Sequence, residues 1–194
     1  MASNGLAGDW ADQYKDWGQK FTPYFDRLSK TPVCVLCWGP GEHAPKELYD
    51  KRMELREHLR KSNPNNKVIT SEEIKQVDTR FAILTDIEAE ELQAREADLI
   101  LVLLTSQKEV SGAHAELLLY RNVPNFYNKT ILLLPKLSAK EAKKLGFSAK
   151  VFENFNPKNI LCYTHDEFVT CQTMREFCRK RVDSNRNEKL FSKL

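Results

Sequence analysis

The feature that most constrains the fold is the apolar run over residues 97–104, which is interrupted only by Asp98. A run of this length without polar alternation suits a strand buried on both faces, as in the centre of a parallel sheet. A polar loop follows, and Ser111 is placed to cap a helix whose apolar face begins at Leu117. Glu116 therefore falls in the opening turns of a helix just past the carboxyl end of a central strand. Ligands bind at such places in open α/β sheets.

Further apolar segments of strand length alternate along the chain with segments of helical periodicity. We expect strands at residues 32–38, 67–70, 129–135 and 159–163, and helices at residues 44–61, 86–96, 138–145 and 166–181. This alternation predicts a flavodoxin- or Rossmann-like three-layer α/β sandwich with a five-stranded parallel sheet in the order 2-1-3-4-5. In that order, the loop after the first strand and the loop before Glu116 flank one crevice.

The chain divides into three parts: an N-terminal aromatic helix (1–30), the α/β domain (31–181) and a charged tail (182–194) that we expect to fray. Aromatic residues of the first part recur at spacings of three and four and form one helical face; they are Trp10, Tyr14, Trp17, Phe21, Tyr24 and Phe25. Pro23 is expected to break or kink this helix. The face either docks on the chain's own domain or forms a dimerisation or partner-binding surface.

Composition excludes several classes of protein. No apolar run approaches the ~20 residues that cross a bilayer, so no membrane is expected. The N-terminus lacks a secretory signal, and five cysteines without dense spacing indicate free thiols in a reducing, cytoplasmic compartment. A net charge of +3 makes nucleic acid an improbable partner. Cys34 and Cys37 lie three apart in a predicted strand and point to opposite faces, so we expect no metal there, and no cofactor is indicated.

Several polar positions are candidates for a binding site. Gly39 and Gly41 follow the first strand and form either a phosphate-approach loop or a mere tight turn. His114 lies one turn from the expected crevice and is either an acid–base group or an ordinary surface histidine. Asp86 is a candidate N-cap of its helix.

Glu116 is the strongest candidate because its position, and not only its type, is predicted. A helix dipole lowers the pKa of a carboxylate near the helix N-terminus, so Glu116 is expected to be ionised at neutral pH. An anion there suits a nucleophile or a cation stabiliser, for example in displacement at the anomeric carbon of a sugar. The alternative is a surface glutamate that only helps the helix to start.

The apolar strand followed by a short loop and Ser111-Gly112-x-x-x-Glu116-Leu117 is similar to the nucleoside 2-deoxyribosyltransferase-like superfamily, which is related to TIR and SLOG domains. The resemblance covers about residues 33–134. It implies that Glu116 attacks or stabilises the anomeric carbon, that Asp86 handles the base, and that Trp38 and the loop to Gly41 hold the substrate.

Two departures refine what the resemblance implies. Transferases of that superfamily commonly carry an aspartate where Gln107, Lys108 and Glu109 stand, which favours hydrolysis or a degenerate sensor. A TIR domain would have Trp-Cys where Ala113 and His114 stand.

The function expected from this resemblance is hydrolysis of the N-glycosidic bond of a nucleoside monophosphate or NAD. Small members of the superfamily often work as nucleotide-depleting effectors in antiphage systems, which is the role that the resemblance implies here. The alternative is a non-catalytic nucleotide-binding sensor that docks to a partner through the aromatic helix. A homo-oligomer or a protein partner is expected in either case.

Overall fold

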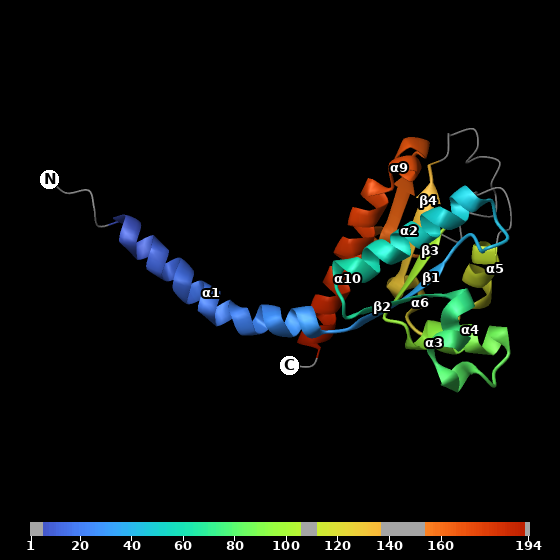
Figure 1. Cartoon of the computed structure of the whole chain (residues 1–194), viewed down its shortest axis with the longest axis horizontal. Coiled ribbons are helices and arrows are strands. Elements are labelled where there is room, and N and C mark those ends of the chain that lie inside the picture. The colour runs from blue at the N-terminus through green and yellow to red at the C-terminus, as the bar shows by residue number, and fades with distance from the viewer. Residues whose placement is uncertain (1–5, 106–111, 137–153, 193–194) are drawn as a thin grey trace.

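The computed structural model describes residues 6–105, 112–136 and 154–192 (Figure 1). Its centre is a five-stranded, all-parallel sheet in the order β2-β1-β3-β4-β5, which confirms the predicted fold class and strand order. The strands are β1 (Val33–Trp38), β2 (Asn66–Thr70), β3 (Leu99–Leu103), β4 (Thr130–Pro135) and β5 (Ile160–Tyr163). Every residue of β3 is buried, as its continuous apolar sequence predicts.

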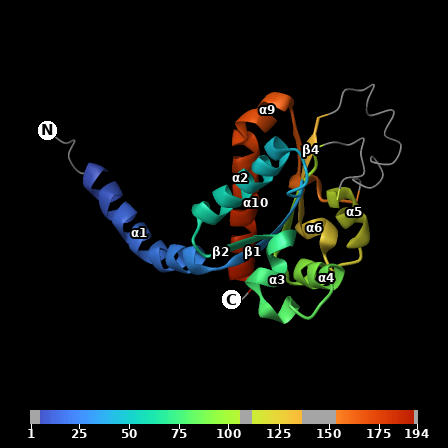
Figure 2. The same cartoon turned by 45° about the vertical axis from the view of Figure 1, so that its right-hand side comes forward.

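Helices cover both faces of the sheet (Figure 2). The helices of the described residues are α1 (Leu6–Lys30), which does not cover the sheet, α2 (Lys46–Ser62), α3 (Ile74–Val77), α4 (Asp86–Glu96), α5 (Gly112–Leu119), α6 (Phe126–Lys129), α9 (His165–Thr170) and α10 (Gln172–Phe191), with short 3-10 turns η1 (Ser71–Glu73), η2 (Thr79–Phe81) and η3 (Pro157–Asn159). The helix expected at 138–145 lies outside the described residues.

Two apolar clusters fill the spaces between the sheet and its helices. On one face, Cys37 and Leu101 pack in a cluster with residues of α2 and with Met174 of α10. On the other face, residues of β1, β3 and β4 pack with residues of α4, α5 and α6. Cys37 lies in the first cluster, whereas Cys34 accepts a hydrogen bond at 3.5 Å from Gln93 of α4, on the second face. The two thiols therefore point to opposite sides of β1, as their spacing predicts.

The C-terminal segment differs from the expectation. The predicted helix at 166–181 is two helices, because Cys171 adopts a left-handed conformation (φ 57°) between α9 and α10. Residues 182–191 are not a frayed tail, since α10 continues to Phe191 and buries Val182, Arg186 and Leu190. Many charged residues of this segment lie around a narrow apolar stripe that packs against the core. This stripe was not recognised in the sequence.

Pro23 lies inside α1, which continues past it as one helix, so of the expected break or kink the break does not occur.

The start of α4 also differs from the expectation. The N-cap of α4 is Thr85, whose hydroxyl accepts from the backbone N–H of Glu88 while Glu88 bonds back to the Thr85 backbone. Asp86 is therefore the first residue of α4 and not its cap.

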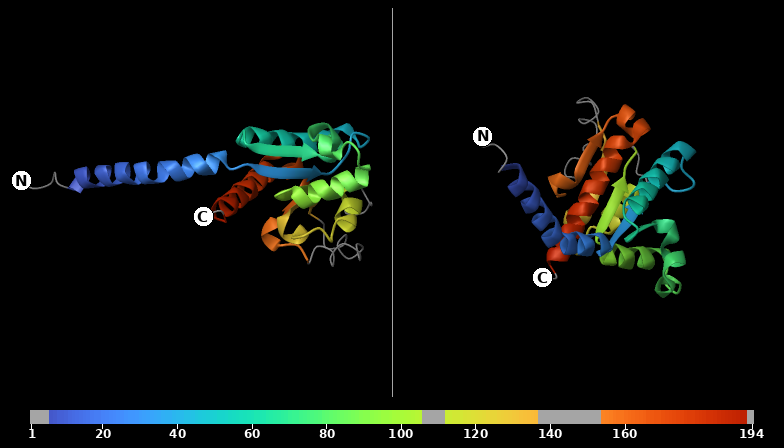
Figure 3. Two further views of the ribbon diagram at one scale, coloured as in Figure 1. Left: turned by 90° about the horizontal axis from the view of Figure 1, so that it is seen from below. Right: turned by 60° about the vertical axis from the view of Figure 1, so that its left-hand side comes forward.

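Helix α1 extends away from the sheet as an arm and meets the rest of the molecule near its C-terminal end, against α10 (Figure 3). Among the described residues, no helix combines the length and the apolar character that a membrane span requires.

Candidate functional site

A pocket of about 330 Å³ opens between η1, α3 and α4, beyond the carboxyl end of β2. Its lining residues are Ser71, Glu72, Ile74, Lys75, Asp86, Ala89 and Glu90. Three of these side chains are carboxylic acids, so the pocket is acidic. Its place at the carboxyl edge of a parallel sheet is where the fold presents ligands.

A pair of carboxyl groups joins this pocket to α5. Glu90 of α4 lines the pocket, and Glu116 of α5 lies close enough for the two carboxyl groups to interact. One oxygen of each group, Oε1 of Glu90 and Oε2 of Glu116, is enclosed without a hydrogen-bond partner among the described residues. Close approach of a second carboxyl group to a partly buried one favours the protonated form of Glu116.

The protonation state of Glu116 is opposite to the one expected from the helix dipole. Burial, followed by the charge of Glu90 and the hydrogen bond to it, raises the pKa of Glu116 to about 9. Desolvation and a like charge together outweigh the dipole at the start of α5. The raised pKa contradicts the expectation that the helix dipole keeps Glu116 ionised, and it favours the protonated form of this side chain.

Tyr120, just after α5, holds the carboxyl group of Glu90 in place. Its hydroxyl donates to Oε2 of Glu90 at 3.0 Å, and its ring stacks on Trp38 with the ring centres 5.4 Å apart. Trp38, at the end of β1, is fully buried, and its indole N–H has no partner among the described residues. Trp38 thus supports the carboxyl pair through Tyr120 and presents no surface of its own.

Arg52 and Glu72 form a second polar pair beside the first. Arg52 of α2 is 4% exposed, and its Nη2 donates to Oε1 of Glu72 at 2.6 Å. Burial alone would raise the pKa of Glu72, but the hydrogen bonds from Arg52 and the backbone prevail and lower it. The Nε of Arg52 is enclosed without a partner among the described residues. Arg52 also lowers the pKa of Glu116 through its charge, so the two pairs interact.

The glycine loop after β1 closes over the Arg52–Glu72 pair. A Cβ at Gly39 would lie 3.1 Å from Cδ of Arg52 and 3.3 Å from the carbonyl oxygen of Leu103, closer than side chains normally approach. A Cβ at Gly41 would lie 3.6 Å from Oε1 of Glu72, an ordinary contact distance. Gly39 is thus required for the close approach of this loop to Arg52.

The predicted site residues differ in where the structure places them: one lines the pocket, two are described incompletely or not at all, and four lie together at the edge of the sheet. Asp86 lines the pocket, but its side chain is exposed and lies 2.8 Å from Nζ of Lys75. Ser111 lies outside the described residues, and of His114 the structure describes the backbone in α5. Trp38, Gly39, Gly41 and Glu116 are brought together at one edge of the sheet through their contacts with Tyr120, Arg52 and Glu72.

Three residues of the site were missed in the sequence: Arg52, Glu90 and Tyr120. Each lies at a position that helical spacing relates to buried or site residues of the same segment. Arg52 lies four residues after Leu48 and three before Leu55, on the buried side of its helix. Glu90 follows the buried Ala89, and Tyr120 lies one helical turn after Glu116. A charged or polar residue on the apolar side of an amphipathic helix is a candidate for a site, because it is costly to bury without a partner.

The chemistry available is that of a carboxyl pair with one proton, a buried guanidinium and a second ionised carboxylate. Such a pair can donate a proton and afterwards offset a positive charge. Among the described residues, no group of three or more histidine, cysteine or acidic side chains is arranged to hold a metal ion.

Comparisons with known proteins add little to this description. No family model and no curated protein matches the chain. One solved structure, of a conserved protein from Enterococcus faecalis, is 15% identical, with a TM-score of 0.41 over 79% of this chain and 98% of that one. At this distance the similarity carries no information on activity.

Proposed function

We propose that this protein hydrolyses the N-glycosidic bond of a nucleotide, either a nucleoside monophosphate or NAD. The observation that carries the proposal is that Glu90 and Glu116 each have an enclosed carboxyl oxygen without a partner among the described residues, at the carboxyl edge of the sheet and beside a pocket that Glu90 lines. Glycoside hydrolysis commonly uses two carboxyl groups near the anomeric carbon, one as the acid and one as the carboxylate. Glu90 and Glu116 would supply these two groups, with the raised pKa of Glu116 favouring it as the acid.

In the proposed reaction the bond between C1′ of the ribose and the base nitrogen breaks, and its electrons stay with the base. Glu116, protonated at rest, gives its proton to a base that needs one to leave. The carboxylates of Glu90 and Glu116 then offset the positive charge of the ribosyl group. Water adds to C1′ and its proton returns to the pair, which regenerates the starting state. Nicotinamide leaves as a neutral molecule, and in that case the proton of the water is released.

The rest of the site would bind the substrate. Lys75 lines the pocket and Arg52 is paired with Glu72, which also lines it, so these two cations are the candidates to contact a phosphate. Gly39 and Gly41 allow the backbone to approach it, as in other phosphate-binding loops. Asp86, Ser111 and His114 remain the expected contacts to the base and ribose.

The test is to incubate the protein with a panel of nucleotides and NAD and to separate the released base by chromatography. Glu116→Gln and Glu90→Gln keep the size of the side chain. Each variant replaces a carboxyl group by an amide, which can neither donate an acidic proton nor carry a negative charge. Each should lower turnover on the order of a hundredfold or more, with a much smaller change in substrate binding.

Glu91→Gln is the matched control, since Glu91 lies on the same helix but pairs with Arg95 at 2.7 Å on the exposed surface. Its turnover should equal that of the wild type. Equal turnover of the Glu116→Gln protein on every active substrate would disprove the mechanism.

A nucleotide sensor without turnover is the second candidate. It is favoured by the state of the cations at the pocket, because Arg52 is paired with Glu72 and Lys75 with Asp86. A bound phosphate would displace a carboxylate and so signal its presence. Tight binding of a nucleotide without release of base would establish this function in place of hydrolysis.

The proposed setting is cytoplasmic, with the protein depleting or sensing nucleotides during antiphage defence. In that setting α1 would associate with a second copy or with a protein partner.

A further inference from the structure

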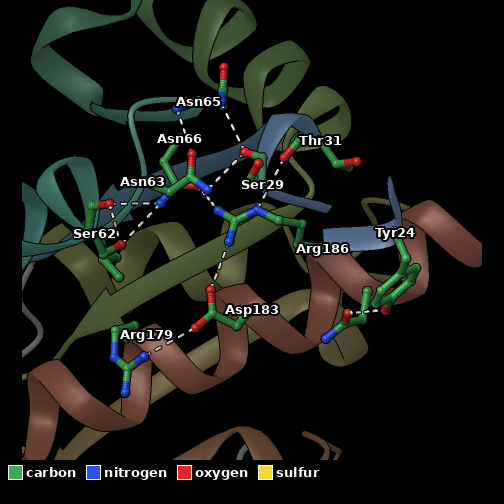
Figure 4. A network of polar contacts seen from close by, with 12 residues as sticks. Tyr24, Ser29, Thr31, Ser62, Asn63, Asn65, Asn66, Arg179, Asp183 and Arg186 are labelled. Atoms are coloured by element: carbon green, nitrogen blue, oxygen red, sulfur yellow. Dashed lines mark hydrogen bonds and ion pairs between the residues drawn. The ribbon is translucent and has the colours of Figure 1, made fainter. Parts of the chain in front are cut away.

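The base of the α1 arm is fixed to the domain by a network of polar contacts (Figure 4). The carbonyl oxygen of Ser29 accepts hydrogen bonds from the side-chain amides of Asn63 and Asn65, each at 3.0 Å. Nε of the buried Arg186 donates to the carbonyl oxygen of Thr31 at 3.2 Å, just after the helix ends. Because several elements hold this end, the direction in which the arm leaves the domain is set.

The sequence of the arm is poorly suited to a helix that stands alone. Gly8, Gly18 and Pro23 all lie inside α1. In a helix interior, glycine costs about 1 kcal/mol and proline about 3 kcal/mol relative to alanine. A Cβ placed at Gly18 would meet nothing within 4 Å, so the domain does not pack against the arm at that point. Helices of this kind are stabilised mainly by packing of an apolar face.

Six of the apolar residues of α1 are spaced alternately by four and three, as in a heptad pattern. They are Trp10, Tyr14, Trp17, Phe21, Tyr24 and Leu28. A sustained 4-3 pattern is the signature of a helix that pairs with another helix along a narrow seam. The seam is longer than the contact with α10, which involves the C-terminal part of α1.

Three exposed phenylalanines belong to the two helices that meet here, Phe21 and Phe25 to α1 and Phe191 to α10. Phe21 is 46% exposed, Phe25 60% and Phe191 59%. The ring centre of Tyr24 is 5.4 Å from that of Phe25 and 5.8 Å from that of Phe191, and its hydroxyl donates to Asn187 at 2.9 Å. We refer to Phe21, Phe25 and Phe191 as the phenylalanine patch.

Charge is distributed unevenly along the arm. Residues 6–17 contain three aspartates and one lysine, whereas residues 18–30 contain three basic residues and one aspartate. Two such helices attract each other when they run antiparallel and repel each other when they run parallel.

We propose that α1 pairs with α1 of a second copy of this chain in an antiparallel arrangement. The acidic, aromatic first half of each arm lies on the phenylalanine patch and the basic second half of the other. The arrangement is a two-fold symmetric dimer, in which each copy offers the same surface to the other. It covers both seams and supplies the packing that a helix with two glycines and a proline requires.

The experiment measures the mass of the full chain by light scattering and sedimentation between 1 and 100 µM. The wild type should be a dimer of the 22.5 kDa chain. Phe21→Lys combined with Phe25→Lys should weaken the dimer at least tenfold. Gln19→Lys is the matched control, since it adds a charge to an exposed position of α1 outside the seam. A thermal unfolding midpoint for each variant shows that the domain remains folded.

Charge reversal tests the orientation. Asp9→Lys with Asp12→Lys should weaken the dimer, and the further changes Arg27→Glu and Lys30→Glu in the same chain should restore it. In a parallel dimer, each half of α1 would face the same half of the other copy. Like charges would then face each other in the wild type and in both variants, so neither the loss nor the recovery would occur. A wild type that is monomeric at 100 µM, or equal dissociation by Gln19→Lys, would overturn the proposal, as would charge variants without effect.

Discussion

At Glu116, two effects on one carboxyl group oppose each other, and their sizes decide the chemistry. A helix dipole at a surface site is worth roughly 0.3–1 kcal/mol. Desolvation beside a second carboxylate acts in the other direction and raises the pKa of Glu116 to about 9. A free acid at neutral pH can protonate a leaving base, whereas an ionised group cannot.

The raised pKa of Glu116 makes stability depend on pH. The ordinary pKa of 4.5 applies to the unfolded chain, so between pH 4.5 and about 9 the folded protein retains a proton that the unfolded chain has lost. Stability therefore falls as pH rises through this window, by at most about 1.4 kcal/mol per pH unit. Glu116→Gln cannot lose a proton, and we expect its thermal unfolding midpoint to exceed that of the wild type increasingly from pH 5 to pH 9. Midpoints of the two proteins that stay parallel across that range would show that Glu116 is ionised in the folded state.

The sequence predicted only those site residues whose place follows from the order of strands and helices along the chain. The location of Glu116 at the carboxyl edge followed from one apolar strand and the helix after it. Glu90 and Arg52 were missed because their roles depend on which helix faces which, and this is decided by tertiary packing. The pKa of Glu116 could not be predicted for the same reason, since its main causes are burial and Glu90.

At the scale of elements, β1, β3 and β4 were predictable because they are mostly apolar and buried, whereas β2 begins with Asn66 and Lys67 and β5 is only partly buried. Helix α10 was predicted too short, because its last turns carry many charges around a thin apolar stripe. One of these charged residues, Arg186, is itself buried on the side of the helix that faces the core. A buried charge interrupts the apolar pattern from which the helix was predicted. Besides Thr31, the guanidinium of Arg186 donates to Asn66 through Nη2 and to Asp183 at 2.8 Å through Nη1.

Arg186→Met keeps much of the side-chain volume but removes every donor of the guanidinium. It leaves the amide oxygen of Asn66 and the carbonyl of Thr31 without this partner. We expect a loss of about 2–4 kcal/mol in the free energy of unfolding, measured by urea denaturation. Arg179→Met is the control, because Arg179 lies on the same helix, is half-exposed and pairs with Asp183 at 3.5 Å. Its effect should stay within about 0.5 kcal/mol, and similar losses for both variants would show that the Arg186 network contributes nothing specific.

At the scale of the whole molecule, the protein combines a sandwich with a two-sided core and an arm that is attached at one end. The contacts that we describe between the two parts involve Tyr24, Ser29 and the residue after the helix, Thr31. The stability of the sandwich should therefore not depend on the first half of the arm.

Deletion of residues 1–17 tests this independence. At a protein concentration low enough to keep the wild type monomeric, the thermal midpoints of the two proteins should agree within about 2 °C. At high concentration the wild type alone should gain stability, because association favours the folded state by mass action. A midpoint lowered by more than about 5 °C at low concentration would show that the deleted half supports the core directly.

The position of α10 has a consequence for how the chain folds during its synthesis. Residues of α10 cover one face of the sheet, against β1, β3, β4 and β5, and they come after all five strands in the chain. While the ribosome is still adding them, that apolar face has no cover from this helix, and neither Asn66 nor Thr31 has its arginine partner. Until translation reaches this helix, the nascent chain is therefore an intermediate with an exposed apolar surface. Chaperones bind surfaces of this kind.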